Sequence, residues 1–176
     1  MAENRGKKFE AAVREAFEKV PDTSVIRLPD PTSGYLGIRN VSDYIVYHYP
    51  HQYFIECKSV HGNTLSIYSK DPKKKYGNIT NNQWEGMLQE GMKYGVVAGV
   101  ICWWIDHDIT RFLPIQVLEY LRIRGDKSIR YDLEFTATLW TPSTTARRCP
   151  IIDITGKKKR VFFEYDMKNL FDQVRG

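Results

Sequence analysis

The chain has 176 residues, of which 42% are hydrophobic and 27% are charged, a composition typical of one soluble globular domain. Its three cysteines are widely spaced and form no CxxC pair, which argues against a disulfide framework or a cysteine-bound zinc site and favours a reducing compartment. No apolar run approaches the ~20 residues that span a bilayer. We therefore expect a single domain over residues 1–176, located in the cytoplasm and without contact with a membrane.

The formal net charge is +5, and the basic residues gather in compact clusters: KDPKKK at 70–75, GKKKR at 156–160, and the pair Arg147 and Arg148. Such clusters are typical of surfaces that bind phosphate backbones, because each contact releases condensed counterions. A solvated face or a mobile loop explains the same composition. Charge alone therefore leaves contact with nucleic acid open.

The first predicted element is a helix over residues 3–20, because its apolar residues recur at the helical period and Pro21 follows them. A loop rich in Pro, Gly, Asp and Ser follows at 21–40, with room for one short strand. Two β-branched and aromatic runs, DYIVYHY and QYFIECKSV, then predict a hairpin over 43–60. The apolar face of the first helix comprises Phe9, Ala12, Val13, Ala16, Phe17 and Val20.

The later elements alternate between helix and strand. Segment 61–79 predicts an exposed basic excursion, and a second helix begins at Thr80. A strand buried on both faces and a neighbouring strand are predicted over 95–115, followed by a short helix over 114–125. Little can be predicted for 138–176 beyond a strand and a short helix in the tail. This order indicates an α/β fold with helices around a mixed sheet.

Three charged residues stand out in the predicted hairpin. Residues two apart on a strand share a face, so Glu56 and Lys58 point to one side and Cys57 to the other. Asp43 lies on the preceding strand, where its carboxylate can converge with that of Glu56. Two close carboxylates resist ionisation unless a cation lies between them, and Mg²⁺ prefers oxygen ligands. With Lys58 available to stabilise a negative transition state, the pattern favours metal-assisted phosphodiester hydrolysis.

Each of these candidates has a simpler interpretation. A solvent-facing edge strand explains the Glu56 and Lys58 spacing, with an ion pair worth at most ~1 kcal/mol. Glu10 is the acid beside the apolar face of the first helix, and it either reaches over the sheet towards the metal or is a boundary residue. Gln83 follows Thr80 at the spacing of a capping box, so it either caps the helix or faces the two acids.

The residues Glu10, Asp43 and Glu56-Cys57-Lys58 match the pattern of the PD-(D/E)xK nuclease superfamily. Three further stretches, NRGKKFEAAV, NITNNQWEGMLQEGMKYGVVAGVI and GDKSIRYDLEFTA, resemble the RecU family of Holliday junction resolvases in the same order over residues 4–137. The resemblance implies a restriction-endonuclease-like core and a homodimeric, Mg²⁺-dependent endonuclease in which Mn²⁺ can substitute. Such enzymes bind four-way DNA junctions and nick two opposing strands symmetrically. They occur in low-GC Gram-positive bacteria and their phages, which implies a bacterial or phage-infected cytoplasm.

The same resemblance assigns roles to individual residues. Asp43 and Glu56 would be metal ligands, together with the backbone carbonyl of Cys57. Lys58 would stabilise the transition state or position the attacking water. Two further residues complete the catalytic and metal-binding set: Glu10, the helix acid, and Gln83. The residues expected to contact DNA are Arg5, Lys7, Lys70, Lys73, Lys74 and Lys75.

The sequence departs from the family in three places. The family often has Thr or Ser two residues before the first Asp, whereas Val41 stands there and Ser42 is adjacent. Segment 21–40 is short for the stalk that enters the junction in the family, and segment 61–79 is long. These differences weaken junction recognition or move it onto 70–75, and they favour a phage origin.

Two alternatives to junction resolution follow. One is another nuclease of the same superfamily that acts on duplex or branched DNA, as restriction and repair enzymes do. The other is a non-catalytic DNA-binding module that kept the fold. The complete set of Asp43, Glu56 and Lys58 argues against the second, because an inactive site has no reason to retain it.

Overall fold

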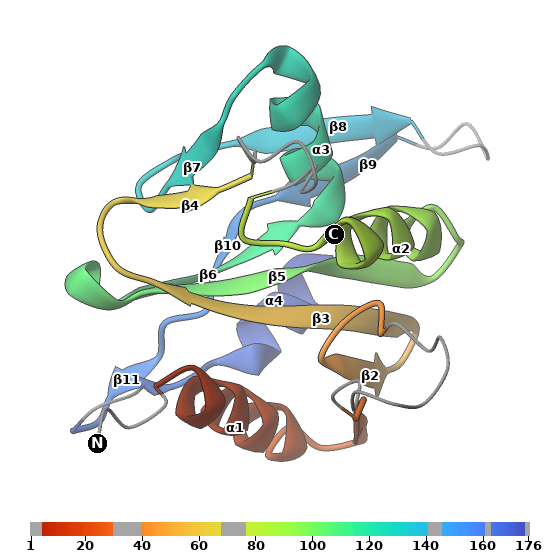
Figure 1. The fold of residues 1–176 in the computed structure, drawn as a ribbon. Coiled ribbons are helices and arrows are strands. Elements are labelled where there is room, and N and C mark those ends of the chain that lie inside the picture. The colour runs from red at the N-terminus through yellow and green to blue at the C-terminus, as the bar shows by residue number, and fades with distance from the viewer. Residues whose placement is uncertain (1–4, 30–39, 68–76, 141–145, 161–162, 175–176) are drawn as a thin grey trace, which may run out of the picture.

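A mixed six-stranded sheet forms the centre of the computed structural model, which describes residues 5–29, 40–67, 77–140, 146–160 and 163–174 (Figure 1). β3 and β5 are parallel, and every other neighbouring pair in this sheet is antiparallel. In spatial order the strands are β1 (Thr23–Arg27), β2 (Tyr44–His48), β3 (His51–Val60), β5 (Val96–Trp104), β6 (Ile109–Pro114) and β10 (Ile152–Asp153).

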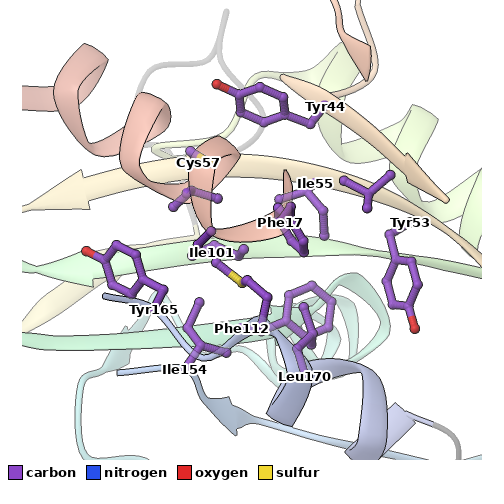
Figure 2. Close-up of a cluster of buried hydrophobic side chains, with 14 of the residues drawn as sticks. Phe17, Tyr44, Tyr53, Ile55, Cys57, Ile101, Phe112, Ile154, Tyr165 and Leu170 are labelled. Atoms are coloured by element: carbon purple, nitrogen blue, oxygen red, sulfur yellow. The ribbon is translucent and has the colours of Figure 1, made fainter. Parts of the chain in front are cut away.

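Helices cover both faces of the sheet (Figure 1). α1 (Arg5–Glu18) and α4 (Met167–Val174) pack on one face, and α2 (Asn81–Gly91) and α3 (Ile115–Arg124) pack on the other. Each face carries its own apolar cluster, and Figure 2 shows the cluster between the sheet, α1 and α4. The α/β class, with a mixed sheet flanked by helices, is confirmed.

The helices follow from local sequence. Phe9, Val13 and Phe17 recur at helical spacing on α1 and are buried against the sheet. α2 begins with a capping box at Thr80. α3 ends at Gly125, whose φ of 101° lies in the left-handed region that favours glycine. Within the described ranges, no helix is long and apolar enough to cross a membrane.

β3 divides its side chains between the two faces. Tyr53, Ile55 and Cys57 belong to the cluster on the α1 face, whereas Phe54 belongs to the cluster on the α2 face. Because side chains alternate along a strand, Glu56 falls on the same face as Phe54, and Lys58 follows it. The predicted sharing of one face by Glu56 and Lys58 is confirmed.

The prediction of an exposed excursion over 61–79 is wrong where this segment enters the core, whereas residues 61–64 are exposed as predicted. β4 (Thr64–Ser66) pairs with β7 (Ser128–Arg130), and Leu65, Ile67 and Ile79 are fully buried. Ser66 and Asn78 close the base of the segment through two hydrogen bonds of 2.9 and 2.8 Å. The lysine run makes the segment polar on average, and this average does not reveal the three apolar residues that pack in the core on the α2 face.

The C-terminal part completes the sheet and its edges. β10 pairs with β6, and α4 confirms the predicted helix in the tail. The remaining strands are short hairpins: β8 (Thr136–Trp140) with β9 (Ala146–Pro150), and β11 (Lys157–Lys158) with β12 (Phe163–Glu164).

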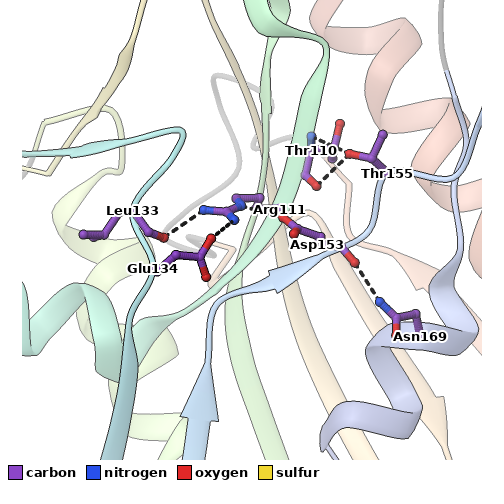
Figure 3. Close-up of polar contacts among 7 residues, drawn as sticks. All are labelled: Thr110, Arg111, Leu133, Glu134, Asp153, Thr155 and Asn169. Atoms are coloured by element: carbon purple, nitrogen blue, oxygen red, sulfur yellow. Dashed lines mark hydrogen bonds and ion pairs between the residues drawn. The ribbon is translucent and has the colours of Figure 1, made fainter.

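Arg111 of β6 joins the segment before β8 and strand β10 through hydrogen bonds (Figure 3). Its buried guanidinium donates to the Leu133 carbonyl and to the Glu134 carboxylate, each at 2.8 Å, and to Asp153 at 2.5 Å. Although burial alone would lower the pKa of Arg111, its hydrogen bonds to Asp153 and Glu134 raise it. The segment before β8 and strand β10 are therefore held to the sheet by one paired cation.

Candidate active site

β3 extends beyond the first residue of β2, so part of β3 has no paired neighbour on that side and the sheet is open there. The last paired residues are Tyr44 and Ile55, and Asp43 stands at the start of β2 beside the opening. The backbone N–H of Asp43 donates to the Ile55 carbonyl at 3.1 Å, and its carboxylate Oδ2 accepts the N–H of Cys57 at 2.8 Å. Because the N–H and C=O of a strand residue point the same way, the Cys57 carbonyl also faces this edge. Asp43 and that carbonyl are thus neighbours.

Glu56 is the buried acid of the site, with 1% of its surface exposed. Its Oε1 lies 2.7 Å from Lys58 Nζ and accepts a hydrogen bond of 2.7 Å from Gln83 Nε2. Burial raises the pKa of Glu56 to about 7, against the lowering effect of Lys58, and the nearby charge of Asp43 adds to the rise. The Glu56 side chain is held in place, but the positive charge around it is too small to keep its pKa at the usual value.

Gln83 performs both of the roles that its sequence position suggested. Its backbone N–H donates to Thr80 Oγ1 at 3.3 Å, and its Oε1 accepts the Thr80 backbone N–H at 3.1 Å, which completes the capping box. Its amide nitrogen meanwhile reaches Glu56 across the opening. In this arrangement Gln83 positions Glu56 through its NH₂ group, while its oxygen serves the helix cap. Coordination of a metal by Gln83 stays a prediction.

The oxygen donors fit a hard divalent cation. Glu56 Oε2 is buried and accepts no hydrogen bond among the described residues, although a buried carboxylate oxygen normally has a partner. Asp43 and the Cys57 carbonyl supply further oxygen ligands at the same edge, which is the donor set that Mg²⁺ prefers. Within the described ranges, no three His, Cys, Asp or Glu side chains already form a metal-binding group. Asp43, Glu56 and the Cys57 carbonyl are therefore the residues that would hold the ion.

Glu10 lies on α1, at the opposite face of the sheet from Glu56. Its side chain is 25% exposed, and its Oε2 is 3.9 Å from the Arg27 guanidinium. The Tyr44 hydroxyl donates to the Glu10 carbonyl at 3.1 Å. Burial raises the pKa of Tyr44 to about 12, and the charge of Glu10 adds to this rise. The structure thus places Glu10 near the start of β2, paired with Arg27, and its role as a metal ligand stays a prediction.

Val41 and Ser42 precede Asp43, where the family often has a hydroxyl two residues before the acid. Ser42 is buried, and its Oγ donates to the Tyr44 carbonyl at 3.0 Å, so its hydroxyl is used in a local hydrogen bond to the backbone. Val41 packs against Gly86 of α2, where an added Cβ would lie 2.9 Å from both Val41 methyl groups. Gly86 therefore lets the chain before Asp43 approach the helix that carries Gln83.

Gly86→Ala is expected to destabilise the protein by about 1–3 kcal/mol, because the new methyl group overlaps with Val41. In an open helix the same change stabilises by about 1 kcal/mol. In a Val41→Ala background the two methyl groups are gone and only the Cβ of residue 41 remains, 3.3 Å from the added Cβ, so Gly86→Ala should there cost much less. Denaturant unfolding of the four proteins of this double-mutant cycle measures the effect. Equal effects of Gly86→Ala in both backgrounds would exclude the contact.

The predicted DNA-contacting residues fall in two groups. Arg5 and Lys7 are exposed in the first turn of α1. The predicted DNA-contacting residues Lys70, Lys73, Lys74 and Lys75 lie outside the described residues, and so does part of segment 21–40, at 30–39.

Arg27 is the residue near the site that sequence reasoning missed. It stands at the end of a short strand, and its position beside Glu10 depends on the register between β1 and β2. No local pattern in the sequence indicates that register, because the β1 segment is short and mostly polar or exposed.

Comparisons with known proteins identify no family for this chain. No family model and no curated protein sequence matches it. One similar solved structure is Hjc from Archaeoglobus fulgidus, described as a Holliday junction resolvase from an archaeal hyperthermophile. It shares 19% identity with a TM-score of 0.48, over 71% of this chain and 88% of that chain. Similarity of this degree carries no argument about function, which has to come from the site.

Proposed function

We propose that the protein is a Mg²⁺-dependent DNA endonuclease that resolves four-way junctions. One observation carries the proposal: Glu56 is a buried acid with one oxygen held by Lys58 and Gln83 and the other without a hydrogen-bond partner in the described structure. Asp43 stands beside it at an open sheet edge. This is the arrangement that the PD-(D/E)xK pattern requires for phosphodiester hydrolysis.

The chain's own residues have distinct parts in this chemistry. A bound Mg²⁺ would supply a Lewis acid and lower the pKa of a coordinated water. Burial acts to lower the pKa of Lys58, but the neighbouring Glu56 carboxylate raises it above its usual value, so Lys58 stays a cation. As a cation it cannot act as a general base, and it stabilises negative charge that develops on the phosphate. Gln83 fixes the rotamer of Glu56.

The finer features of the proposal come from the resemblance to the RecU family. Paired, symmetric nicks need two active sites, so we propose that a homodimer carries out the reaction. The substrate is DNA with four-way branching, and Mn²⁺ replaces Mg²⁺. Residues Arg5 and Lys7 and the lysines of 70–75 bind the phosphate backbone.

The decisive experiment compares cleavage of a synthetic four-way junction with cleavage of linear duplex of the same sequence, each with Mg²⁺ and with EDTA. The proposal predicts symmetric nicks in the junction, little cutting of the duplex, and none in EDTA. Equal cutting of both substrates would remove junction resolution and leave a general nuclease. No cutting with either Mg²⁺ or Mn²⁺ would support a non-catalytic DNA-binding module.

Replacing Lys73, Lys74 and Lys75 together with Ala is expected to weaken junction binding and to lower the salt dependence of the binding constant. Each lost phosphate contact lowers the slope of log K against log salt by about 0.9. The measurement is a series of binding isotherms in EDTA between about 50 and 200 mM salt, a range in which such contacts dominate.

A matched control replaces three exposed lysines elsewhere, Lys19, Lys93 and Lys168, with Ala. This control removes the same charge and leaves residues 70–75 unchanged. If both triple variants have the same slope, Lys73, Lys74 and Lys75 contribute only net charge and do not contact the DNA backbone.

A further inference from the structure

Arg27 lies beside the candidate site. It ends β1 and pairs with Tyr44 of β2, and the next residue, Leu28, donates its N–H to the Asp43 carbonyl at 2.9 Å. Cross-strand partners share a face of the sheet, so Arg27 projects with Tyr44 towards α1. Figure 2 shows the Tyr44 hydroxyl directed at that helix. There the Arg27 guanidinium approaches Glu10 to 3.9 Å.

Two cations pair with two acids near the site, Lys58 with Glu56 and Arg27 with Glu10, but the two ion pairs differ in length and exposure. Lys58 is 25% exposed and lies 2.7 Å from the buried Glu56. Arg27 is 42% exposed and lies 3.9 Å from Glu10. An ion pair that is long and exposed contributes little free energy. The contact between Arg27 and Glu10 can therefore be exchanged for another anion at small cost.

Formal charges show which anion completes the arrangement. The three acids Glu10, Asp43 and Glu56 and the two cations Lys58 and Arg27 carry a net formal charge of minus one. A divalent cation reverses that charge, and one phosphodiester then brings it to zero. A guanidinium suits this anion, because its planar fork matches two phosphate oxygens.

We propose that Arg27 binds a DNA phosphate beside the scissile bond and that, in the DNA-free protein, it holds Glu10 away from the metal site. The inference rests on the proposed function. When DNA arrives, its phosphate takes the guanidinium, and the Glu10 carboxylate becomes available to the ion near Asp43. Arg27 is then a phosphate-binding residue that links substrate binding to completion of the metal site.

The first test measures Mn²⁺ binding to the DNA-free protein by calorimetry. Arg27→Ala is expected to bind Mn²⁺ about threefold more tightly than wild type, since an exposed pair of this strength no longer competes for Glu10. The control Arg14→Ala removes an exposed arginine from α1, where it pairs with Glu18. Its Mn²⁺ affinity should equal that of wild type. Unchanged or weaker Mn²⁺ binding by Arg27→Ala would overturn the hold on Glu10.

The second test measures junction binding in EDTA. Arg27→Ala should bind more weakly, with a salt slope smaller by about 0.9, whereas Arg27→Lys should keep the slope because it keeps the charge. A residue with a merely structural role would weaken Mn²⁺ and DNA binding together, so opposite signs in the two tests are diagnostic. If Arg27→Ala and Arg14→Ala have the same slope, Arg27 does not contact phosphate.

A double mutant separates this inference from the proposed function. In a Glu10→Gln background, Arg27→Ala should leave Mn²⁺ affinity unchanged, because the competing carboxylate is gone. A wild-type protein that neither binds Mn²⁺ nor cuts DNA contradicts the proposed function itself. A wild-type protein that does both, while Arg27→Ala matches Arg14→Ala in both tests, overturns only the role of Arg27.

Discussion

Asp43→Asn and Glu56→Gln are each expected to lower the rate of junction cleavage by about three orders of magnitude or more, because each removes a carboxylate charge from the proposed metal site. Both changes keep the shape of the side chain. The amide oxygen introduced by Asp43→Asn can still accept the Cys57 N–H, and the one introduced by Glu56→Gln can still accept from Gln83. Junction binding in EDTA should therefore survive in both variants.

Single-turnover cleavage with saturating Mg²⁺ measures this loss, and a binding isotherm in EDTA confirms that each variant is folded and binds DNA. Glu15→Gln is the matched control, since Glu15 is an exposed acid of α1. It should cut at the wild-type rate. If either site variant also cuts at the wild-type rate, the assignment of Asp43 and Glu56 to the metal is wrong.

The metal-free protein is expected to lose stability as the pH rises from about 5 to 8. The folded state raises the pKa of Glu56 from 4.5 to about 7, so it binds more protons than the unfolded state between these values. The free energy of unfolding therefore falls across this window, with the full loss reached above the folded pKa. A shift of this size corresponds to about 3 kcal/mol.

Urea unfolding in EDTA at several pH values measures this effect as the difference between wild type and Glu56→Gln. The wild-type curve should fall relative to that of the variant as the pH rises, while Glu15→Gln should follow wild type. Adding Mg²⁺ at the upper end of this window should recover stability for wild type and Glu15→Gln but not for Glu56→Gln, because a cation between the carboxylates favours their ionised forms. Parallel pH profiles for wild type and Glu56→Gln would show that ionised Glu56 carries no cost.

These two predictions describe one physical compromise. A buried carboxylate with an oxygen that accepts no hydrogen bond in the described structure is unfavourable for folding without a cation. The same oxygen is a ready ligand for a divalent ion. Lys58 and Gln83 hold the Glu56 side chain in place, but they do not fully compensate the cost of burying its charge, so a divalent cation bound there would stabilise the ionised form.

Much of this fold was predictable because short-range periodicity determines it. The spacing of Phe9, Val13 and Phe17 predicted the inner face of α1, and the alternation of β3 placed Glu56 and Lys58 together. The spacing of Thr80 and Gln83 predicted the helix cap. In each case the interacting residues are separated by a fixed local geometry.

The contacts that escaped prediction depend on long-range register. β4 pairs with β7 from a distant part of the chain, and no local pattern indicates this pairing, so the sequence predicts an exposed excursion where Leu65 is buried. The pairing of Arg27 with Glu10 requires β1 to pair with β2 and α1 to pack on the face of the sheet towards which Arg27 projects. The contact between Gln83 and Glu56 was one of two alternatives that the sequence left open, and it forms because α2 packs on that face of β3.

The central claim is that Asp43 and Glu56 hold a divalent cation on which cleavage depends. The most direct measurement is anomalous diffraction from crystals soaked in Mn²⁺ at the concentration that gives full cleavage. We expect a peak about 2.0–2.4 Å from carboxylate oxygens of Asp43 and Glu56, and we expect Glu56→Gln to lose it. An ordered peak elsewhere, with none between these two side chains, would contradict it.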